Sequence, residues 1–233
     1  MCHPGKYILA ILLLALFTVL SVQSLYETGQ NSFWDPVGAG DETFRAKFFS
    51  EELEEEALSE ACKALQRQVA GEIQYFPVPD SVLDPGLTTS YVNTWMAERS
   101  YGGKRGHEGI DIMADVQRPG LYPVVSMTDG VVTNLGWLEQ GGYRIGITGD
   151  SGTYYYYAHL DSYGQVGKGD RVRAGELLGY MGDSGYGPEG TRGKFDVHLH
   201  VGIYVYQEGE EISLNPYYVL QALEDRRLRY EYS

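Results

Sequence analysis

The chain has 233 residues, of which 43% are hydrophobic and 21% charged, so its composition is that of a folded protein and excludes a wholly disordered chain. Its 18 Lys and Arg residues stand against 32 Asp and Glu, and the net charge of −14 argues against a nucleic-acid partner, which requires a basic face. The 30 glycines and 20 tyrosines favour strands and turns. Two cysteines, Cys2 and Cys62, are too few for a disulfide-dense scaffold or a four-thiolate zinc site.

The first predicted element is an uncharged apolar segment over residues 7–22, preceded by Lys6 and followed by acidic residues from Glu27 onward. It is shorter than the about 20 apolar residues of a comfortable membrane span, so it fits either a signal anchor or the core of a signal peptide. We expect residues 1–24 to be a cytoplasmic stub and a retained single-pass anchor, with the rest of the chain outside the cell. The alternative is secretion after cleavage near Leu25.

Residues 25–71 predict a polar linker followed by an amphipathic, acidic helix from Thr43 to Ala70. The apolar residues of the helix recur at spacings of three to five, and they are Phe44, Phe48, Leu53, Ala57, Ala61, Leu65 and Val69. Gly71 is placed to stop the helix. The acidic run over residues 51–56 fits a solvated helix face, and the helix itself would serve as a stalk or as packing for the following domain.

Residues 72–233 consist of short β-branched and aromatic runs separated by Gly, Asp and Pro, which predicts one mainly-β, antiparallel domain. A hairpin turn is expected at residues 150–152 between two alternating runs. By the same alternation, Tyr155 and Tyr157 would share a strand face with His159, while Tyr154 and Tyr156 would point the other way. Tyr157 and Tyr204 are candidate walls of a substrate groove, although ordinary strand packing is the favoured interpretation of both.

Four of the five histidines lie in this domain, and with one aspartate they form a candidate metal site. His198 and His200 are two apart in a strand, so their side chains point to the same face. His107 and Asp111 are four apart and lie on one side of an extended chain. Imidazole nitrogen and carboxylate oxygen both suit zinc, and three protein ligands would leave a position for water and two histidines beside the metal.

A zincin helix is excluded as the source of this pattern. The motif HExxH would need a histidine at position 111, where the chain has Asp111, and Gly109 would interrupt a helix.

Three motifs in order carry a resemblance to a known family. They are RGHEGIDIMA at residues 105–114, YYYYAHL at residues 154–160 and HLH at residues 198–200. Together with WMAERSYGG, PVVSMTDGVV, VRAGELLGYMGDSG and LNPYYVL, they resemble the lysostaphin/LytM-type zinc endopeptidases of bacterial cell walls. The resemblance covers residues 74–220 and implies the duplicated hybrid motif fold, in an antiparallel sheet or sandwich. One departure from the family pattern is Val197, where the family often has proline.

The resemblance also implies roles for the five residues. His107, Asp111 and His200 would be the ligands of one zinc ion per chain, and His159 and His198 would be the catalytic pair. Zinc would activate water for hydrolysis of a peptide bond in peptidoglycan, and the two histidines would move its proton and stabilise the oxyanion. Which histidine is the base stays open, as does the bond that is cleaved. The loops over residues 137–143 and 182–194 are expected to border the groove and to choose that bond.

Two alternatives come from other classes of protein. A non-catalytic scaffold of the same fold would bind wall polymers or a protein partner after losing ligands, whereas here all five positions are filled. A biotinyl or lipoyl carrier resembles the run GDRVRAGELLGYMG at residues 169–182, but it needs a lysine at a hairpin tip. Lys168 precedes that run in a Gly-rich turn and lacks this context.

Overall fold

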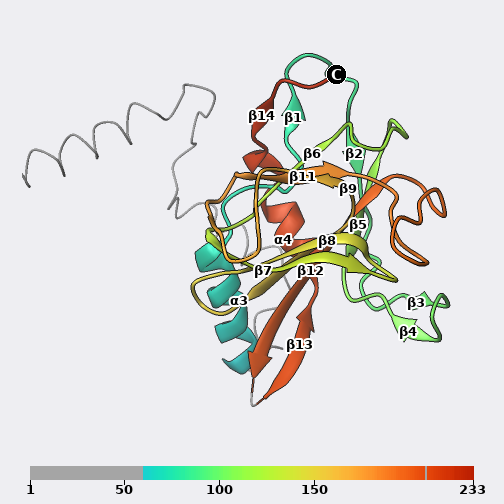
Figure 1. Cartoon of the computed structure of the whole chain (residues 1–233). Coiled ribbons are helices and arrows are strands. Elements are labelled where there is room, and N and C mark those ends of the chain that lie inside the picture. Colours follow the sequence, from blue (N-terminus) through green and yellow to red (C-terminus); the bar gives the residue numbers. More distant parts are fainter. Residues whose placement is uncertain (1–59, 208) are drawn as a thin grey trace, which may run out of the picture. The chain divides into compact units, whose positions relative to one another are not determined.

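The computed structural model describes residues 60–207 and 209–233 of the chain (Figure 1). The predicted apolar segment, the linker and the first part of the predicted helix lie outside these residues. Among the described helices, none is long and apolar enough to cross a membrane.

The described chain is mainly β, as the sequence predicted. Its helices are α3 (Glu60–Glu72), α4 (Pro216–Ala222) and a 3₁₀ turn (Glu224–Arg226). Its strands are β1 (Asp80–Ser81), β2 (Thr89–Ser90), β3 (Glu98–Arg99), β4 (Arg105–Gly106), β5 (Ile110–Ala114), β6 (Pro123–Val125), β7 (Gly130–Leu138), β8 (Gly142–Thr148), β9 (Tyr154–Tyr163), β10 (Arg171–Val172), β11 (Leu177–Met181), β12 (His198–Gln207), β13 (Glu210–Leu214) and β14 (Arg229–Tyr230).

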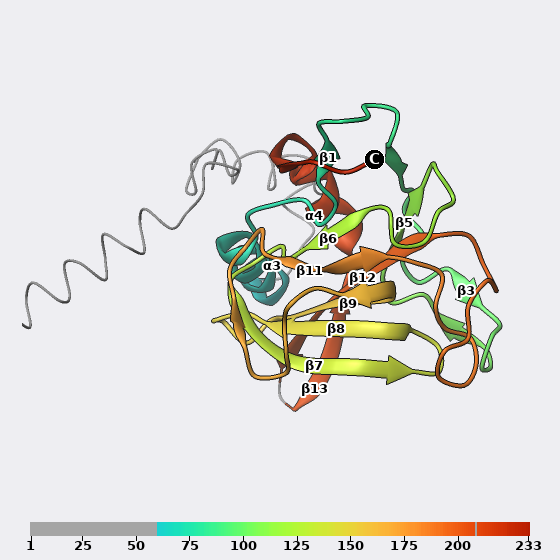
Figure 2. The same ribbon diagram turned by 45° about the horizontal axis from the view of Figure 1, so that its top comes forward.

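One large antiparallel sheet forms the body of the domain, with the strand order β10-β7-β8-β9-β12-β5-β2. Figure 2 shows β7, β8 and β9 side by side. Strand β13 pairs with β12, and β11 joins the end of β9 to β6. The only described parallel pair joins the two-residue strands β1 and β14. The hairpin of β3 and β4 pairs only with itself and stands beside the sheet (Figure 1).

The turn between β8 and β9 lies at residues 149–153, which confirms the predicted hairpin. The Gly149 amide donates to the Thr153 carbonyl at 2.9 Å, and the Gly152 amide donates to the Gly149 carbonyl at 3.0 Å. Gly152 has φ of +88°, a left-handed conformation that glycine adopts without a Cβ clash.

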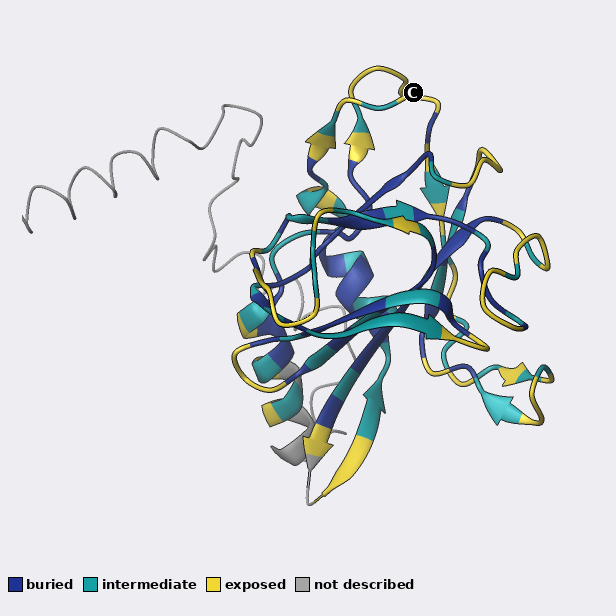
Figure 3. Cartoon of the chain, viewed as in Figure 1, coloured by how far each residue is buried: buried dark blue, intermediate teal, exposed yellow. Residues whose placement is uncertain are grey.

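The hydrophobic core is formed by buried side chains of the strands, which are dark blue in Figure 3. Ile145 and Ile147 of β8 and Leu199, Val201 and Ile203 of β12 are fully buried because they occupy alternate positions of their strands. The intervening positions of these strands face a groove on the other side of the sheet. Strict alternation therefore divides each strand between core and groove.

Helix α3 packs against this domain, which agrees with the packing role considered above. Val69 and Ala70 are buried in the core, and Ile73 follows them. The helix runs to Glu72, two residues beyond the predicted end, and Gly71 does not have a positive φ. Contacts with the hairpin turn explain this extension. Glu72 accepts hydrogen bonds from the Ser151 amide and from the Tyr155 hydroxyl, the latter at 3.1 Å.

Candidate active site

Asp111 and His200 meet because β5 and β12 are adjacent antiparallel strands. The register pairs His200 with Asp111 and His198 with Met113, so the two residues are direct cross-strand neighbours. Asp111 Oδ1 lies 3.0 Å from His200 Nδ1. The sheet therefore joins two of the predicted ligands that are 89 residues apart in the sequence.

His107 reaches the same point because the chain before β5 passes over the His200 ring. A Cβ atom at Gly109 would lie 2.5 Å from His200 Cε1 and Nε2 and 2.6 Å from the Val201 carbonyl oxygen. Only glycine allows this approach. His107 Nε2 then lies 3.0 Å from Asp111 Oδ1 and 3.0 Å from His200 Nδ1. Residues 105–111, which carry His107 and Asp111, form no helix, in agreement with the exclusion of a zincin motif.

These three atoms fit one metal ion. In the described part of the chain, His107, Asp111 and His200 form the only group of at least three His, Cys, Asp or Glu residues that could hold an ion. Tetrahedral zinc with bonds of about 2.0–2.1 Å separates its ligand atoms by about 3.3 Å, close to the spacing found here. Two imidazole nitrogens and one carboxylate oxygen are also a donor set that zinc favours. The three residues thus suit zinc in both spacing and chemistry.

Hydrogen bonds fix the orientation of the candidate ligands. His107 Nδ1 lies 3.2 Å from the Thr94 carbonyl oxygen and 3.0 Å from Arg99 Nη2, and these contacts hold the ring with Nε2 facing Asp111 and His200. Burial alone would raise the pKa of Asp111, but hydrogen bonds to His107 and His200 outweigh it and hold the pKa below its ordinary value. Burial lowers the pKa of His200, against the influence of Asp111. An ionised carboxylate and a neutral imidazole are the forms that bind a metal.

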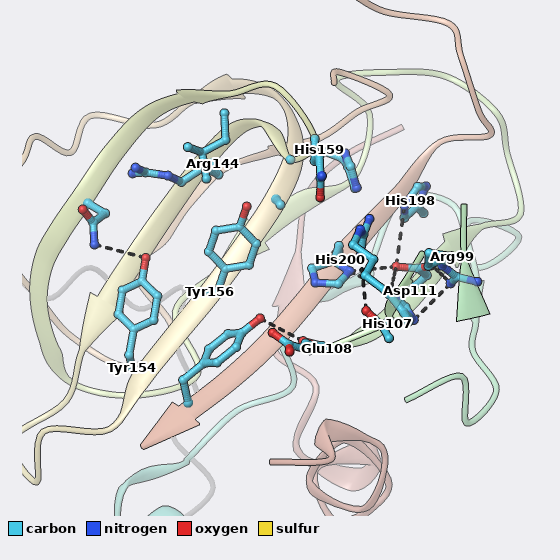
Figure 4. Close-up of a pocket in the computed structure, with 18 of the residues that line it drawn as sticks. Arg99, His107, Glu108, Asp111, Arg144, Tyr154, Tyr156, His159, His198 and His200 are labelled. Atoms are coloured by element: carbon cyan, nitrogen blue, oxygen red, sulfur yellow. Dashed lines mark hydrogen bonds and ion pairs between the residues drawn. The ribbon is translucent and has the colours of Figure 1, made fainter. Parts of the chain in front are cut away.

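His159 and His198 lie beside this cluster (Figure 4). Their ring centroids are 4.6 Å apart, and the ring of Phe195 packs 4.6 Å from that of His159 and 5.0 Å from that of His198. His198 Nε2 is 3.7 Å from Asp111 Oδ1. The structure thus brings all five predicted residues to one place.

Each of these two histidines is held by a backbone carbonyl at Nδ1. His198 Nδ1 is 2.7 Å from the Asp196 carbonyl oxygen, and His159 Nδ1 is 2.8 Å from that of Ser184. Donation at Nδ1 leaves Nε2 as the nitrogen that accepts or delivers a proton. Burial, then the nearby His198 and His200, lowers the pKa of His159 well below its ordinary 6.5. His159 is therefore neutral at pH 7.

The prediction that Tyr155 and Tyr157 share a face with His159 is wrong. His159 has φ of +61°, and the pairing register of β9 shifts at this point on both sides. Tyr155 and Tyr157 are fully buried in the core, whereas Tyr154, Tyr156 and His159 line the groove. Tyr157 is a packing residue, the favoured interpretation, and its hydroxyl accepts from the Met127 amide at 2.9 Å.

The groove has a volume of about 1220 Å³ and runs from the histidine cluster along β9 and β12. Tyr204 lines it, as considered for a substrate wall, and donates a hydrogen bond of 2.9 Å to the Glu108 carbonyl oxygen. The loops predicted to border the groove contribute Leu138, Gln140 and Tyr186. The groove therefore passes directly over the candidate metal site.

Sequence reasoning missed two residues that support this site. Ser184 is fully buried and carries the carbonyl that holds His159, while its hydroxyl donates to the Leu160 carbonyl at 2.6 Å. Arg99 comes from the β3–β4 hairpin and donates to Asp111 Oδ2 at 2.9 Å. The run GDSG at residues 182–185 was a signal for a turn near Ser184. No local pattern marked Arg99.

Comparison with known proteins assigns the class. Residues 105–216 match Peptidase family M23. A solved structure from Ruminococcus gnavus, provisionally described as the glycyl-glycine endopeptidase LytM, is 48% identical. The alignment covers 88% of this chain and 94% of that one, with a TM-score of 0.68. This chain belongs to peptidase family M23, and the resemblance found in the sequence is confirmed.

Two curated relatives are endopeptidases. The L-Ala–D-Glu endopeptidase of Bacillus subtilis (strain 168) is 46% identical over 144 residues, which cover 61% of this chain and 42% of that protein. The glycyl-glycine endopeptidase ALE-1 of Staphylococcus capitis is 33% identical over 107 residues, which cover 42% of this chain and 28% of that protein. The chain thus spans less than half the length of either relative.

Proposed function

We propose that this protein is a zinc-dependent endopeptidase that hydrolyses peptide bonds in bacterial peptidoglycan. The observation that carries the proposal is the triangle of His107 Nε2, Asp111 Oδ1 and His200 Nδ1, each 3.0 Å from the others. This triangle lies in a groove that also holds two non-ligand histidines with Nε2 free. Membership of a peptidase family and the activities named for the relatives support it.

In this proposal His107, Asp111 and His200 hold one zinc ion. Zinc held there would lower the pKa of a water molecule and polarise the scissile carbonyl. His159 is neutral and buried, and its Nε2 takes a proton from the attacking water and returns it to the amine nitrogen as the C–N bond breaks. His198 lies beside it, and in its imidazolium form, with Nδ1 still donating to the Asp196 carbonyl, its Nε2 donates to the oxygen that becomes negative as the carbonyl is attacked. Exchange of these two roles is the alternative.

The relatives give two candidate bonds, L-Ala–D-Glu and glycyl-glycine. Digestion of purified peptidoglycan and of defined wall peptides, followed by mass analysis of the products, tests both. We expect cleavage by the zinc-loaded protein, loss of cleavage after chelation and recovery when zinc is restored. Wall material left intact by protein with bound zinc would favour the non-catalytic scaffold.

The ligand assignment has its own test in the metal content of the full-length protein. Asp111→Ala removes one of three ligands, so zinc content should fall from close to one ion per chain to a small fraction, as measured by plasma mass spectrometry. Asp115→Ala, at an exposed aspartate beyond the end of β5, is the matched control and should bind zinc normally. Unchanged zinc in Asp111→Ala would contradict the assignment.

We further propose that the apolar segment at residues 7–22 anchors the protein in the bacterial membrane, with the peptidase domain outside. A wall substrate and the positive residue before the segment support this orientation. Full-length protein should stay in the membrane fraction after a high-salt wash. A soluble form that starts near Leu25 would show cleavage and secretion instead.

A further inference from the structure

Arg144 is a cation in the groove whose side chain has no hydrogen-bond acceptor among the described residues. It lies on β8, and its Nε and Nη1 atoms are shielded from solvent without a hydrogen-bond acceptor. No ion pair to it occurs in residues 60–207 and 209–233. Arg99, by contrast, donates to Asp111. A guanidinium left without an acceptor away from water is costly, so such a group calls for an explanation.

Two tyrosine hydroxyls lie in the same part of the groove (Figure 4). The Tyr154 hydroxyl accepts a hydrogen bond of 3.2 Å from Asn134 Nδ2, and its own proton has no acceptor in the described chain. The Tyr156 hydroxyl has no hydrogen-bond partner there either. Burial raises the pKa of both hydroxyls, against the lowering influence of Arg144. Both phenols therefore stay protonated and can donate.

Glycines make room for these tyrosines. A Cβ atom at Gly141 would lie 2.2 Å from the Tyr156 hydroxyl oxygen, and one at Gly146 would lie 2.0 Å from that of Tyr154. Side chains at these positions would displace both rings. The groove thus places three groups together that donate hydrogen bonds and accept none from each other: a guanidinium and two phenols. Such a set suits a carboxylate, which only accepts.

The distance from the metal site suits a peptide substrate. His200 on β12 pairs with Ala158 on β9, and Arg144 on β8 lies opposite the bulge at Ala158 and His159. Arg144 and His200 are thus in one row across the sheet, two strand spacings or about 10 Å apart at the backbone. A peptide bond held over the ligands leaves its neighbouring residues within reach of the arginine side chain.

We propose that Arg144, with Tyr154 and Tyr156, forms a subsite for a free carboxylate of the peptide substrate. The inference rests on the endopeptidase function proposed above and chooses between its candidate bonds. A glutamate residue uses one of its two carboxyl groups in the chain and keeps the other, whereas a glycine bridge offers no side-chain carboxylate. The subsite therefore selects acidic wall peptides over neutral ones. Arg105 also lines the groove without an ion pair among the described residues, so this part of the groove suits an anion in a chain whose net charge is −14.

Peptides that differ in one group test this directly. The first probe is L-Ala–D-Glu–L-Lys with an amidated C-terminus, so that the glutamate keeps the single free carboxylate. The second has that carboxylate replaced by an amide, the third has the amide there and a free C-terminus, and the fourth is pentaglycine amide. Wild-type kcat/KM should be about 10- to 100-fold higher for the first than for the second. If the third peptide were cleaved faster than the first, the recognised carboxylate would be the one at the C-terminus, and selection for the glutamate carboxylate would be wrong.

Variants assign the preference to the residue. Arg144→Gln should abolish the difference in kcat/KM between the first two peptides. Arg144→Lys should keep part of this difference, because lysine keeps the positive charge but cannot form the paired hydrogen bonds of a guanidinium. Arg118→Gln removes the same charge from an exposed site outside the groove and should keep the full preference. Arg144→Gln should not lower the unfolding midpoint, because it removes an unpaired cation. A preference that survives in Arg144→Gln would overturn the proposal.

Calorimetric titration of full-length protein separates this proposal from the endopeptidase function. Wild type should bind the first peptide at least 10-fold more tightly than the second, and Arg144→Gln should bind the two equally. This result would support the subsite even if no peptide were cleaved, in which case the endopeptidase function alone would fail. Cleavage of pentaglycine amide only, or equal binding of the first two peptides by wild type, would overturn the subsite and leave the endopeptidase function standing.

Discussion

Arg99 Nη2 donates a hydrogen bond of 2.9 Å to Asp111 Oδ2, while the other oxygen of the same carboxylate, Oδ1, lies 3.0 Å from both His107 and His200. The two oxygens of one side chain thus have separate partners. Arg99 comes from a hairpin outside the main sheet, so this contact fixes the rotation of the Asp111 carboxylate from a second element of the fold.

Loss of this contact should weaken metal binding. Arg99→Gln removes the charged donor that orients Asp111, and we expect zinc Kd to rise about 10- to 100-fold, as measured by competition with a chelating dye. Lys104→Gln removes a positive charge from the same hairpin, at an exposed residue that pairs with Glu98 at 3.2 Å, and should leave Kd unchanged. Tighter binding in Arg99→Gln would show instead that the arginine charge repels the ion.

Gly109 should tolerate no side chain. Its substitution by alanine would place Cβ 2.5 Å from the His200 ring and 2.6 Å from a backbone oxygen, so the strand or the ring must move. We expect Gly109→Ala to lose most bound zinc and about 1–3 kcal/mol of stability in urea unfolding. Gly71→Ala, in α3 with no atom within 4 Å of the new Cβ, should bind zinc normally and be slightly more stable. Full zinc in Gly109→Ala would contradict the close approach.

The two histidines of one strand should separate by phenotype. His198→Ala and His159→Ala should keep zinc and fold, while the rate falls about 10²- to 10⁴-fold because each loses a group that transfers or donates a proton. His200→Ala should lose zinc and rate together. Zinc content and cleavage rate are measured on the same samples. Loss of zinc in His198→Ala would show that His198 is a metal ligand. A wild-type rate in His198→Ala or His159→Ala would show that the substituted histidine takes no part in the reaction.

The lowered pKa of His159 predicts an acid limit for stability. The folded protein resists protonation of this residue, whereas the unfolded chain protonates it near the ordinary pKa of 6.5. Below pH 6.5 the unfolded state binds more protons, so stability falls as pH falls toward the folded pKa and is unaffected by this group above pH 7. In metal-free protein, His159→Gln should show a smaller loss of unfolding midpoint between pH 7 and pH 5 than wild type. Equal losses of unfolding midpoint in the two proteins would show that His159 does not cause the acid destabilisation.

Strand alternation explains why most of the site was predictable. His198 and His200 share a face because β12 is regular, and the His107–Asp111 spacing closes onto that face through the β5–β12 register. His159 was identified by family resemblance, but its face was assigned wrongly. It has a positive φ at a bulge, and its ring is held by the Ser184 carbonyl, 25 residues further along the chain. Local sequence does not encode such a contact.

Arg99 and Arg144 escaped prediction for a related reason. Arginine is common on strand surfaces, and neither spacing nor composition distinguishes one with a partner in the site from one without. Only the fold shows that Arg99 meets Asp111 and that Arg144 has no acceptor in residues 60–207 and 209–233. The strands can be predicted from the hydrophobic pattern of the sequence. The roles of Arg99 and Arg144 depend on contacts between residues far apart in the sequence, which only the folded structure shows.

The attachment of α3 to the β8–β9 turn has a mechanical consequence. Glu72 binds the Ser151 amide and the Tyr155 hydroxyl, and Gln68 donates to Thr153 at 2.9 Å. Tension applied through the chain that precedes the helix therefore reaches the sheet at this turn, which joins the end of β8 to the start of β9. The helix spreads such a pull over several side-chain bonds before the first core strand is loaded.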